Sequence, residues 1–280
     1  MNPTTTFSFT PIGYVHCPQK YRYEAPRQAV FAGNAGTIEL LPHHNYETAL
    51  RELETFDRIW VIFAFHLNRN WKPTVRPPVA GEKEKVGVFA SRSPHRPNPI
   101  GMSCVELDGI SRLTLHIRNF DLLDGTPVLD LKPYIVRADC FPDAATGWLP
   151  ERLPQEWRLQ FTPTAVAQMS FIRDNSGLDL ENFAIVQLRN SPLHKSRKRV
   201  TANADGTYMI ACRTWRICFR PDPDTLQVRV LRIESSYPGE ELAPERPDVY
   251  GDKDVHRAFL TRFETAAAVE EKTHDFGSGA

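Results

Sequence analysis

The sequence lacks the residue patterns of the common metal and cofactor sites. Its five cysteines are odd in number and show no Cys-x-x-Cys spacing, which argues against a disulfide framework and a zinc ribbon and favours a reducing compartment. It has no His-Glu-x-x-His motif, EF-hand pattern, P-loop or Gly-x-Ser-x-Gly motif, so no dedicated metal site is expected. Its only Gly-x-Gly is Gly277-Ser278-Gly279. A nucleotide-type cofactor would therefore need an architecture other than a glycine turn between a strand and a helix.

Long apolar runs and a surplus of charge are also absent. The longest apolar run, Ile59 to Phe65, is far too short to cross a bilayer, and residues 1–10 do not resemble a signal peptide. The 34 Lys and Arg residues balance 34 Asp and Glu residues, so a polyanionic partner must be met by a local patch. We therefore expect a cytoplasmic protein without membrane association.

Proline, in contrast, is abundant in residues 87–101, where a short apolar strand enters a loop with two arginines, a histidine and an asparagine. Pro94, Pro97 and Pro99 fix φ and favour extended geometry in the residues before them, so the polar side chains lie on a stiff backbone. Stiff polar loops held by strands often carry binding residues. A rigid connection with solvated arginines explains the stretch equally well.

The pattern of the first 140 residues predicts many short strands with one early helix, which favours an antiparallel barrel or sandwich. The helix is expected over about Asn45–Glu54, and the Asp124-Gly125 turn is expected at the tip of a hairpin. The strand at 58–66 lacks strict alternation and is predicted to be covered on both faces. The expected strands are Phe7–His16, Thr37–Leu40, Arg58–His66, Met102–Ile110 and Thr114–Phe120.

The composition changes after about residue 140. We predict a mainly β protein with a β domain at 1–140, a linker at 141–160, a smaller α+β domain at 161–237 and an acidic, partly disordered tail at 238–280. In the second domain, one helix begins at Thr162-Pro163 and ends near Asn175-Ser176-Gly177, and Asp179 caps another. A hairpin pairs Tyr208–Arg220 with Leu226–Glu234. Residues 189–220 hold eight Lys or Arg against one acid, a pattern of solvated loops that is also the footprint of phosphate-backbone binding.

Five segments in order resemble the TsaA-like or TrmO family of tRNA methyltransferases, over about residues 7–140. They are Pro26-Arg27-Gln28, the Trp60 strand ending at His66, Val75-Arg76-Pro77-Pro78, the Arg92–Gly101 loop and Asp121–Tyr134. The resemblance implies an antiparallel β-barrel enzyme that uses S-adenosylmethionine to methylate N6 of threonylcarbamoyladenosine beside the anticodon of tRNA. It also implies a homodimer.

The same resemblance implies a set of cofactor-binding residues. Asp124 would contact ribose or amino groups, Arg27 or Arg92 the methionine carboxylate, and backbone groups near Gly125 the adenine. Cys104 lies where a backbone contact is implied, although a different side chain is usual there. The full set is Pro26, Arg27, Gln28, His66, Leu67, Arg92, Cys104, Asp124, Gly125 and Thr126.

Transfer of an already activated sulfonium methyl needs mainly alignment of the acceptor nitrogen. Asp130, His66 and Tyr134 are unranked candidates for a proton acceptor, and a structural ion pair between Asp130 and Lys132 is an equally good interpretation. Planar guanidinium groups suit carboxylate and phosphate. The candidate RNA-binding residues are Arg96, Asn98, Lys195, Arg197, Lys198 and Arg199.

The second half of the chain departs from the bacterial members. They typically carry an Asp-Pro-Arg-Pro motif and a tyrosine after the helix that corresponds to Phe183–Leu188, whereas this chain has Leu188-Arg189-Asn190-Ser191-Pro192-Leu193-His194. Two alternatives therefore stay open. One is an RNA-binding module that keeps the barrel without catalysis, and the other is a methyltransferase for another adenosine or a small molecule.

Overall fold

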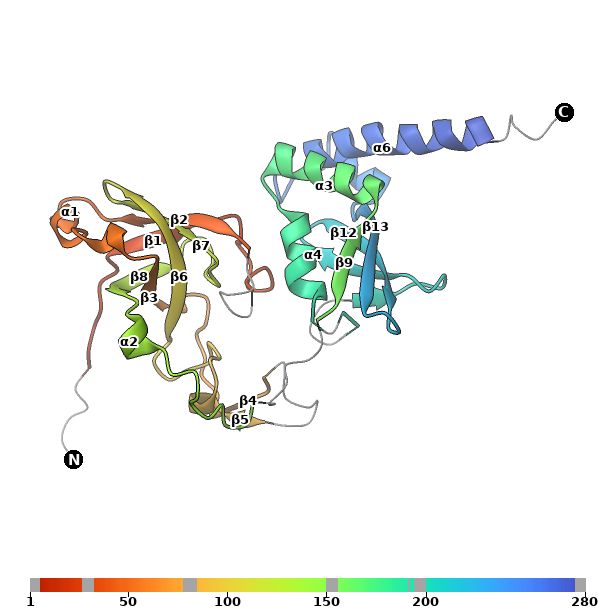
Figure 1. Cartoon of the computed structure of the whole chain (residues 1–280). Coiled ribbons are helices and arrows are strands. Elements are labelled where there is room, and N and C mark those ends of the chain that lie inside the picture. The colour runs from red at the N-terminus through yellow and green to blue at the C-terminus, as the bar shows by residue number, and fades with distance from the viewer. Residues whose placement is uncertain are drawn as a thin grey trace. The chain divides into compact units, whose positions relative to one another are not determined.

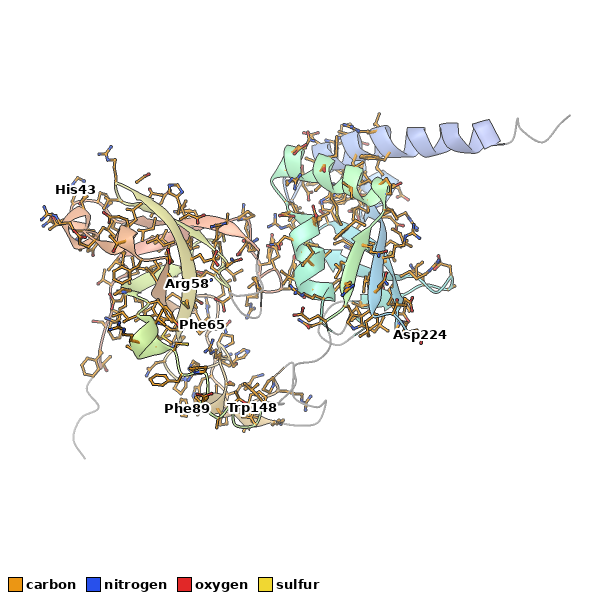
Figure 2. The ribbon with its side chains drawn as sticks, viewed as in Figure 1. His43, Arg58, Phe65, Phe89, Trp148 and Asp224 are labelled. Carbon is orange, nitrogen blue, oxygen red and sulfur yellow. The ribbon has the colours of Figure 1, made fainter. Side chains whose placement is uncertain are left out.

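The chain folds into two compact units, residues 1–154 and residues 155–280 (Figure 1, with side chains in Figure 2). The computed structural model describes residues 6–26, 33–77, 85–149, 156–190, 192–193 and 200–274, with side chains described as far as Phe263.

The first unit is a closed six-stranded barrel in which every neighbouring pair is antiparallel. Around the barrel the strands follow the order β1-β2-β7-β6-β3-β8. This confirms the barrel that the resemblance implied. The strands are β1 (Gly13–His16), β2 (Ala35–Leu40), β3 (Arg58–Ala64), β6 (Ile100–Ser111), β7 (Thr114–Arg118) and β8 (Pro127–Pro133).

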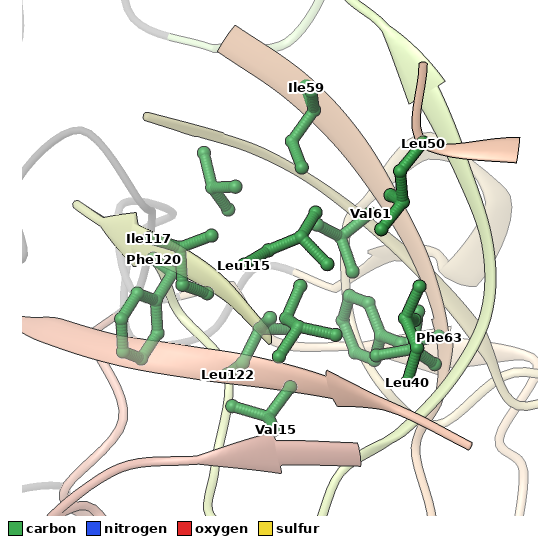
Figure 3. Close-up of a cluster of buried hydrophobic side chains, with 13 residues drawn as sticks. Val15, Leu40, Leu50, Ile59, Val61, Phe63, Leu115, Ile117, Phe120 and Leu122 are labelled. Atoms are coloured by element: carbon green, nitrogen blue, oxygen red, sulfur yellow. The ribbon is translucent and has the colours of Figure 1, made fainter. Parts of the chain in front are cut away.

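The interior of the barrel is filled by aliphatic and aromatic side chains from alternate strand positions (Figure 3). In β3, Ile59, Val61 and Phe63 point inward and are at most 5% exposed, whereas Trp60 and Ile62 are only partly covered. The prediction that this strand is covered on both faces is therefore wrong. A barrel strand turns one face to the core and the other outward, and here the outward residues are also apolar.

The Asp124-Gly125 turn is present, but it does not join two paired strands. Gly125 has φ 71°, and the Thr126 amide donates to the Leu123 carbonyl at 3.1 Å. β8 pairs with β1 and β3 rather than with β7, so the predicted hairpin is wrong. Closing the barrel requires β8 to fill the gap between β1 and β3, and the turn lies in a connection that crosses one end of the barrel.

The early helix is shorter than predicted. It comprises α1 (Tyr46–Ala49) and a 3-10 turn η2 (Leu53–Thr55), because Asn45 and Glu52 adopt positive φ values of 56° and 65°. The predicted strand from Phe7 begins only at Gly13. The remaining short elements of this unit are β4 (Thr74–Val75), β5 (Val86–Gly87), η3 (Val88–Ala90) and α2 (Val136–Asp139).

The second unit is a five-stranded sheet in the order β10-β11-β12-β13-β9, and β9 is parallel to β13. Its strands are β9 (Arg158–Phe161), β10 (Val200–Ala202), β11 (Tyr208–Cys212), β12 (Trp215–Asp222) and β13 (Gln227–Ser235). Its helical elements are α3 (Pro163–Ser176), α4 (Leu180–Leu188), η4 (Gly239–Leu242) and α6 (Lys253–His274).

Capping residues fix the ends of the two predicted helices of this unit. The Thr162 hydroxyl accepts from the Ala165 amide at 3.1 Å, and Gly177 ends α3 with φ 69°. The Asp179 carboxylate accepts from the Asn182 amide at 2.9 Å and begins α4. Both helix predictions are confirmed. The predicted Tyr208–Arg220 strand is instead two strands, which reverse where Arg213 has φ 50°.

The segment after residue 238, which its acidic composition predicts to be a partly disordered tail, includes part of the second unit. His256, Phe259 and Lys253 of α6 are at most 4% exposed, and the Trp215 ring stacks on the His256 ring. The residues of α6 as far as Phe263 therefore pack within this unit. Among the described residues, no helix is long and apolar enough to cross a membrane.

Candidate active site at the barrel mouth

Three connections between barrel strands lie at the same end of the barrel: β1 to β2, β3 to β6 and β7 to β8. Ala64 at the end of β3 pairs with Ile100 at the start of β6, and Phe63 pairs with Val128 near the start of β8. Tyr14 of β1 pairs with Pro127, the first residue of β8. We call this end the barrel mouth, and its described residues are 17–26, 65–70, 91–99 and 121–126. The strand register therefore brings together segments that are far apart in the sequence.

The turn before β8 is fixed to the residues that follow β1. The Gly125 amide donates to the Val15 carbonyl and the Asp124 amide to the Gln19 carbonyl, both at 2.8 Å. Oδ1 of Asp124 accepts from the Cys17 amide at 3.1 Å, and Thr126 is 97% buried. The turn is therefore rigid, and the Asp124 carboxylate is held in one orientation at the mouth.

The proline-rich loop is held by the residues that follow β3. The Val88 amide donates to the Pro73 carbonyl at 3.0 Å, and the Lys72 amide donates to the His95 carbonyl at 3.1 Å. On another side, Nε1 of Trp148 donates to the Ala90 carbonyl at 2.7 Å, near Phe89 (Figure 2). These bonds make the loop a rigid part of the mouth.

The two arginines of this loop have different environments. The Arg96 guanidinium donates to the carbonyls of Val88 and Ser91, at 3.2 and 2.8 Å, and lies 5.7 Å from the centre of the Phe89 ring. Arg96 therefore stabilises the loop itself, as in the interpretation of a rigid connection. The Arg92 side chain is exposed.

Asp121, the first residue of the predicted Asp121–Tyr134 segment, is paired with Ser103, a residue that sequence reasoning missed. The Ser103 hydroxyl, 4% exposed on β6, donates to the Asp121 carboxylate just after β7. Burial raises the pKa of Asp121, and the Ser103 hydrogen bond and the positive charge of Arg92 oppose this rise. A polar residue at an inward position of a barrel strand is the signal in the sequence that could have identified Ser103.

His66 and Leu67 are exposed at the end of β3. Partial burial lowers the pKa of His66, so its imidazole is neutral at pH 7 and can accept a proton.

Two buried polar atoms near the mouth have no hydrogen-bond partner among the described residues. They are Oε1 of Gln19 and Nδ2 of Asn68. The Asn68 amide is oriented by Arg22, whose guanidinium donates to Oδ1 at 3.2 Å. An unpaired buried donor or acceptor costs about 1–3 kcal/mol. Nδ2 of Asn68 is thus an unpaired donor, and Oε1 of Gln19 is an unpaired acceptor. Together with the exposed Arg92 cation, these atoms fit a ligand that carries hydrogen-bonding edges and a carboxylate.

Not every candidate residue lies at the mouth. The amide of Tyr134 donates to the Arg58 carbonyl at the start of β3, and seven residues of strand, about 20 Å, separate this end from the mouth. Cys104 faces Trp60 in the middle of the barrel wall. Asp130 forms an ion pair with Lys132 at 2.9 Å, which is the structural alternative that the sequence left open.

The other candidates lie partly outside the described residues. Pro26 is buried at the mouth, whereas Arg27 and Gln28 lie outside the described residues. Asn98 is exposed in the proline-rich loop. Of the predicted RNA-binding run, Lys195, Arg197, Lys198 and Arg199 also lie outside the described residues.

Comparisons with known proteins agree with this architecture. Residues 14–140 match the family described as tRNA-methyltransferase O N-terminal domain. The chain is 39% identical over 172 residues to the tRNA (adenine(37)-N6)-methyltransferase of Escherichia coli strain K12, covering 59% of this chain and 73% of that protein. A probable S-adenosyl-L-methionine-binding protein of Pyrococcus abyssi is 42% identical over 142 residues, covering 50% of this chain and 75% of that protein.

A solved structure shows the same likeness over a longer part of the chain. The crystal structure of TrmO from Pseudomonas aeruginosa superposes with a TM-score of 0.62 at 31% identity, covering 83% of this chain and all of that chain. The fold, the mouth and these relatives define a β-barrel methyltransferase that uses S-adenosylmethionine and acts on tRNA. The chain belongs to the TrmO family.

Proposed function

We propose that this chain methylates N6 of threonylcarbamoyladenosine at the position beside the anticodon of tRNA. The observation that carries the proposal is the convergence of Arg92, His66 and Asp124 at one barrel mouth. The proposal accounts for an exposed cation, a neutral imidazole and a fixed carboxylate around one site. Five free cysteines in the described residues accord with a cytoplasmic location, which we also propose.

The protein groups at the mouth suit the binding of S-adenosylmethionine, which when bound supplies an activated sulfonium methyl. Arg92 would bind the carboxylate of the methionine part, because a guanidinium pairs with a carboxylate through two parallel hydrogen bonds. The unpaired Oε1 of Gln19 and Nδ2 of Asn68 would bind polar edges of the ligand, and Asp124 would bind a hydroxyl or amino group. The rigid turn and loop would then align the acceptor nitrogen, and such alignment lowers the barrier without further side-chain chemistry.

His66 is the best placed of the three candidate proton acceptors. It lies at the mouth, and partial burial lowers its pKa and keeps it neutral at pH 7. Asp130 is paired with Lys132, and Tyr134 lies at the far end of β3. Burial also raises the pKa of Tyr134, which keeps its phenol protonated. We therefore assign the acceptance of the N6 proton to His66.

We also propose that two copies of the chain pair through the outer wall of the barrel formed by β3, β6 and the segment around α2. This wall carries a partly exposed apolar side chain from β3 and exposed apolar side chains from β6 and from the residues before and within α2. Both Ile100 and Met102 lie on the outer surface of β6, where Ile100 is 37% exposed and Met102 is 55% exposed. An apolar patch of this kind on a folded domain marks an interaction surface. The wall comprises Ile62, Ile100, Met102, Ile135 and Val136.

The test of the proposed function uses S-adenosylmethionine labelled on the methyl group and two preparations of the same tRNA. One preparation carries the threonylcarbamoyl group on the target adenosine and the other lacks it. We expect label on N6 of the modified nucleoside only. Equal labelling of both tRNAs, or of neither, would contradict the substrate, and label on another adenosine would favour a different tRNA site.

A further inference from the structure

One face of the sheet in the second unit is packed against helices and the other is exposed. On the packed face, the Trp215 ring stacks on His256 of α6, and the Gln168 side chain of α3 accepts from the Ile233 amide. Side chains alternate between the two faces of a strand. The alternate positions of β12, β13 and β9 therefore form the opposite face, and their polar members are exposed or partly exposed.

Arginine dominates this exposed face. We call it the arginine face, and its members are Arg158 of β9, Arg216 and Arg220 of β12, and Arg229 and Arg232 of β13. The strand register places Arg220 directly opposite Arg229, and Gln160 follows beside Arg229 on β9. Glu234 and Asp222 are the two carboxylates at the same alternate positions. The face therefore carries a local surplus of positive charge on a chain whose net charge is zero.

The fold gives no reason for this arrangement. Like charges directly opposite each other on antiparallel strands are destabilising, and Arg220 and Arg229 are such a pair. Within the described part of the chain, Arg158, Arg220 and Arg229 form no ion pair.

The nearby acidic groups neutralise little of the positive charge of the arginine face. Glu234 is paired with Arg232 at 2.7 Å, and Asp222 accepts from the Thr225 hydroxyl at 2.6 Å. Hydrogen bonds from Thr207, and less strongly the charge of Arg220, hold the pKa of Asp205 below its usual range. Guanidinium groups that the protein itself leaves unpaired are available to an anionic partner.

We propose that the arginine face binds the phosphate backbone of the tRNA substrate. The inference rests on the proposed function, because it takes its partner from that substrate. Arginine suits phosphate oxygens through planar, paired hydrogen bonds, and an open sheet surface presents several guanidinium groups to successive phosphates. No aromatic side chain occupies the alternate positions of this face on β9, β12 and β13, so the contact is with the backbone and does not read the base sequence.

The experiment compares two double variants with the same change of charge. Arg220→Gln with Arg229→Gln removes the facing pair, and Arg173→Gln with Arg246→Gln removes two exposed arginines outside the arginine face. Dissociation constants for the tRNA are measured by fluorescence anisotropy between about 50 and 200 mM salt, a range over which binding through phosphate contacts weakens strongly. S-adenosylmethionine affinity by calorimetry and the unfolding temperature of each variant are the controls.

We expect Arg220→Gln with Arg229→Gln to weaken tRNA binding about tenfold or more at ~100 mM salt, and to reduce the slope of log Kd against log salt by about 2. The affinity for S-adenosylmethionine should not change, and the unfolding temperature should stay the same or rise, because a like-charge pair is removed. The control variant, Arg173→Gln with Arg246→Gln, should keep most of the tRNA affinity.

An unchanged tRNA affinity and slope in the Arg220 and Arg229 double variant would overturn the proposal, as would an equal loss in the control. Failure of the proposed function is a separate result, because it would appear as absence of methylation by the wild-type chain. Methylation by the wild type together with unchanged affinity of the variant would overturn the arginine face alone.

Discussion

Arg92 and Arg96 are four positions apart in one rigid loop, yet the tertiary structure gives them different tasks. Arg96 donates to the loop carbonyls of Val88 and Ser91, so its removal would leave two acceptors to water and loosen the loop. Arg92 is exposed, and its charge acts on the buried carboxyl of Asp121. At the residue scale, the exposed arginine is therefore the candidate for ligand binding.

Arg92→Ala tests this assignment. We expect it to weaken the binding of S-adenosylmethionine by about 10- to 100-fold, which corresponds to the roughly 1.5–3 kcal/mol of a hydrogen bond to a charged group. Isothermal titration calorimetry measures the change. Arg51→Ala, which removes an exposed arginine of the same unit outside the mouth, is the matched control and should not alter the affinity. An equal affinity in Arg92→Ala and the wild type would remove Arg92 from the ligand site.

At the scale of the elements, α6 is fixed to the sheet by a buried polar network around His256. Nδ1 of His256 lies 2.7 Å from the Ser235 hydroxyl, and Nε2 lies 3.0 Å from the Thr214 hydroxyl. Asp252 accepts from Thr214 at 2.6 Å and from the Tyr237 hydroxyl at 2.9 Å. Lys253 donates to the Glu241 carbonyl. These bonds satisfy a histidine that is fully buried, so the helix cannot move away without exposing unpaired groups.

This network makes the second unit sensitive to acid. Burial lowers the pKa of His256 from its ordinary value of 6.5 to about 4, although the charges of Asp252 and Asp248 act in the opposite direction. Between these pH values the unfolded chain binds a proton that the folded chain excludes, so the free energy of unfolding falls as the pH falls. At roughly 1.4 kcal/mol for each pKa unit, we expect a loss of about 3 kcal/mol between pH 6.5 and pH 4.

Urea unfolding of the wild type and of His256→Gln at several pH values checks this expectation. Glutamine can keep one hydrogen bond and does not titrate, so the stability of this variant should vary less over the same interval. The pKa values of Asp205, Asp222 and Asp248 are lowered, so their contributions are lost only below about pH 4. Parallel pH profiles for the wild type and the variant would show that His256 is not the responsible group.

At the scale of the whole molecule, the outer wall of the barrel is predicted to pair two copies of the chain. Met102→Glu would place a carboxylate in the same apolar wall of both copies, because a two-fold interface uses the same patch twice. Like charges across an interface cost several kcal/mol, so we expect mainly monomer in sedimentation velocity experiments. Val166→Glu, which changes an exposed apolar residue of α3, should sediment as the wild type does. Identical sedimentation of Met102→Glu and the wild type would contradict the proposed wall.

Features that depend on neighbouring residues are predictable from the sequence alone. Capping by Thr162 and Asp179, the stop at Gly177 and the turn at Gly125 follow from local hydrogen bonds and backbone conformation, and the structure shows all four. The family resemblance added the barrel and the set of segments at its mouth. The predicted helix at 45–54 is shorter in the structure because Asn45 and Glu52 have positive φ values. The apolar pattern of Leu50 and Leu53 does not reveal these conformations.

The identity of neighbouring strands, and of the polar groups that are already paired, depends instead on the tertiary structure. Closure of the barrel placed β8 between β1 and β3, and this register brought the turn at Asp124 to His66 and the proline-rich loop. The same packing buried Ser103 beside Asp121 and used Arg96 within its own loop. It also set Arg220 opposite Arg229 on an open sheet face. Pairing between distant segments depends on the burial of the whole core, so residue types and local spacing do not encode it separately.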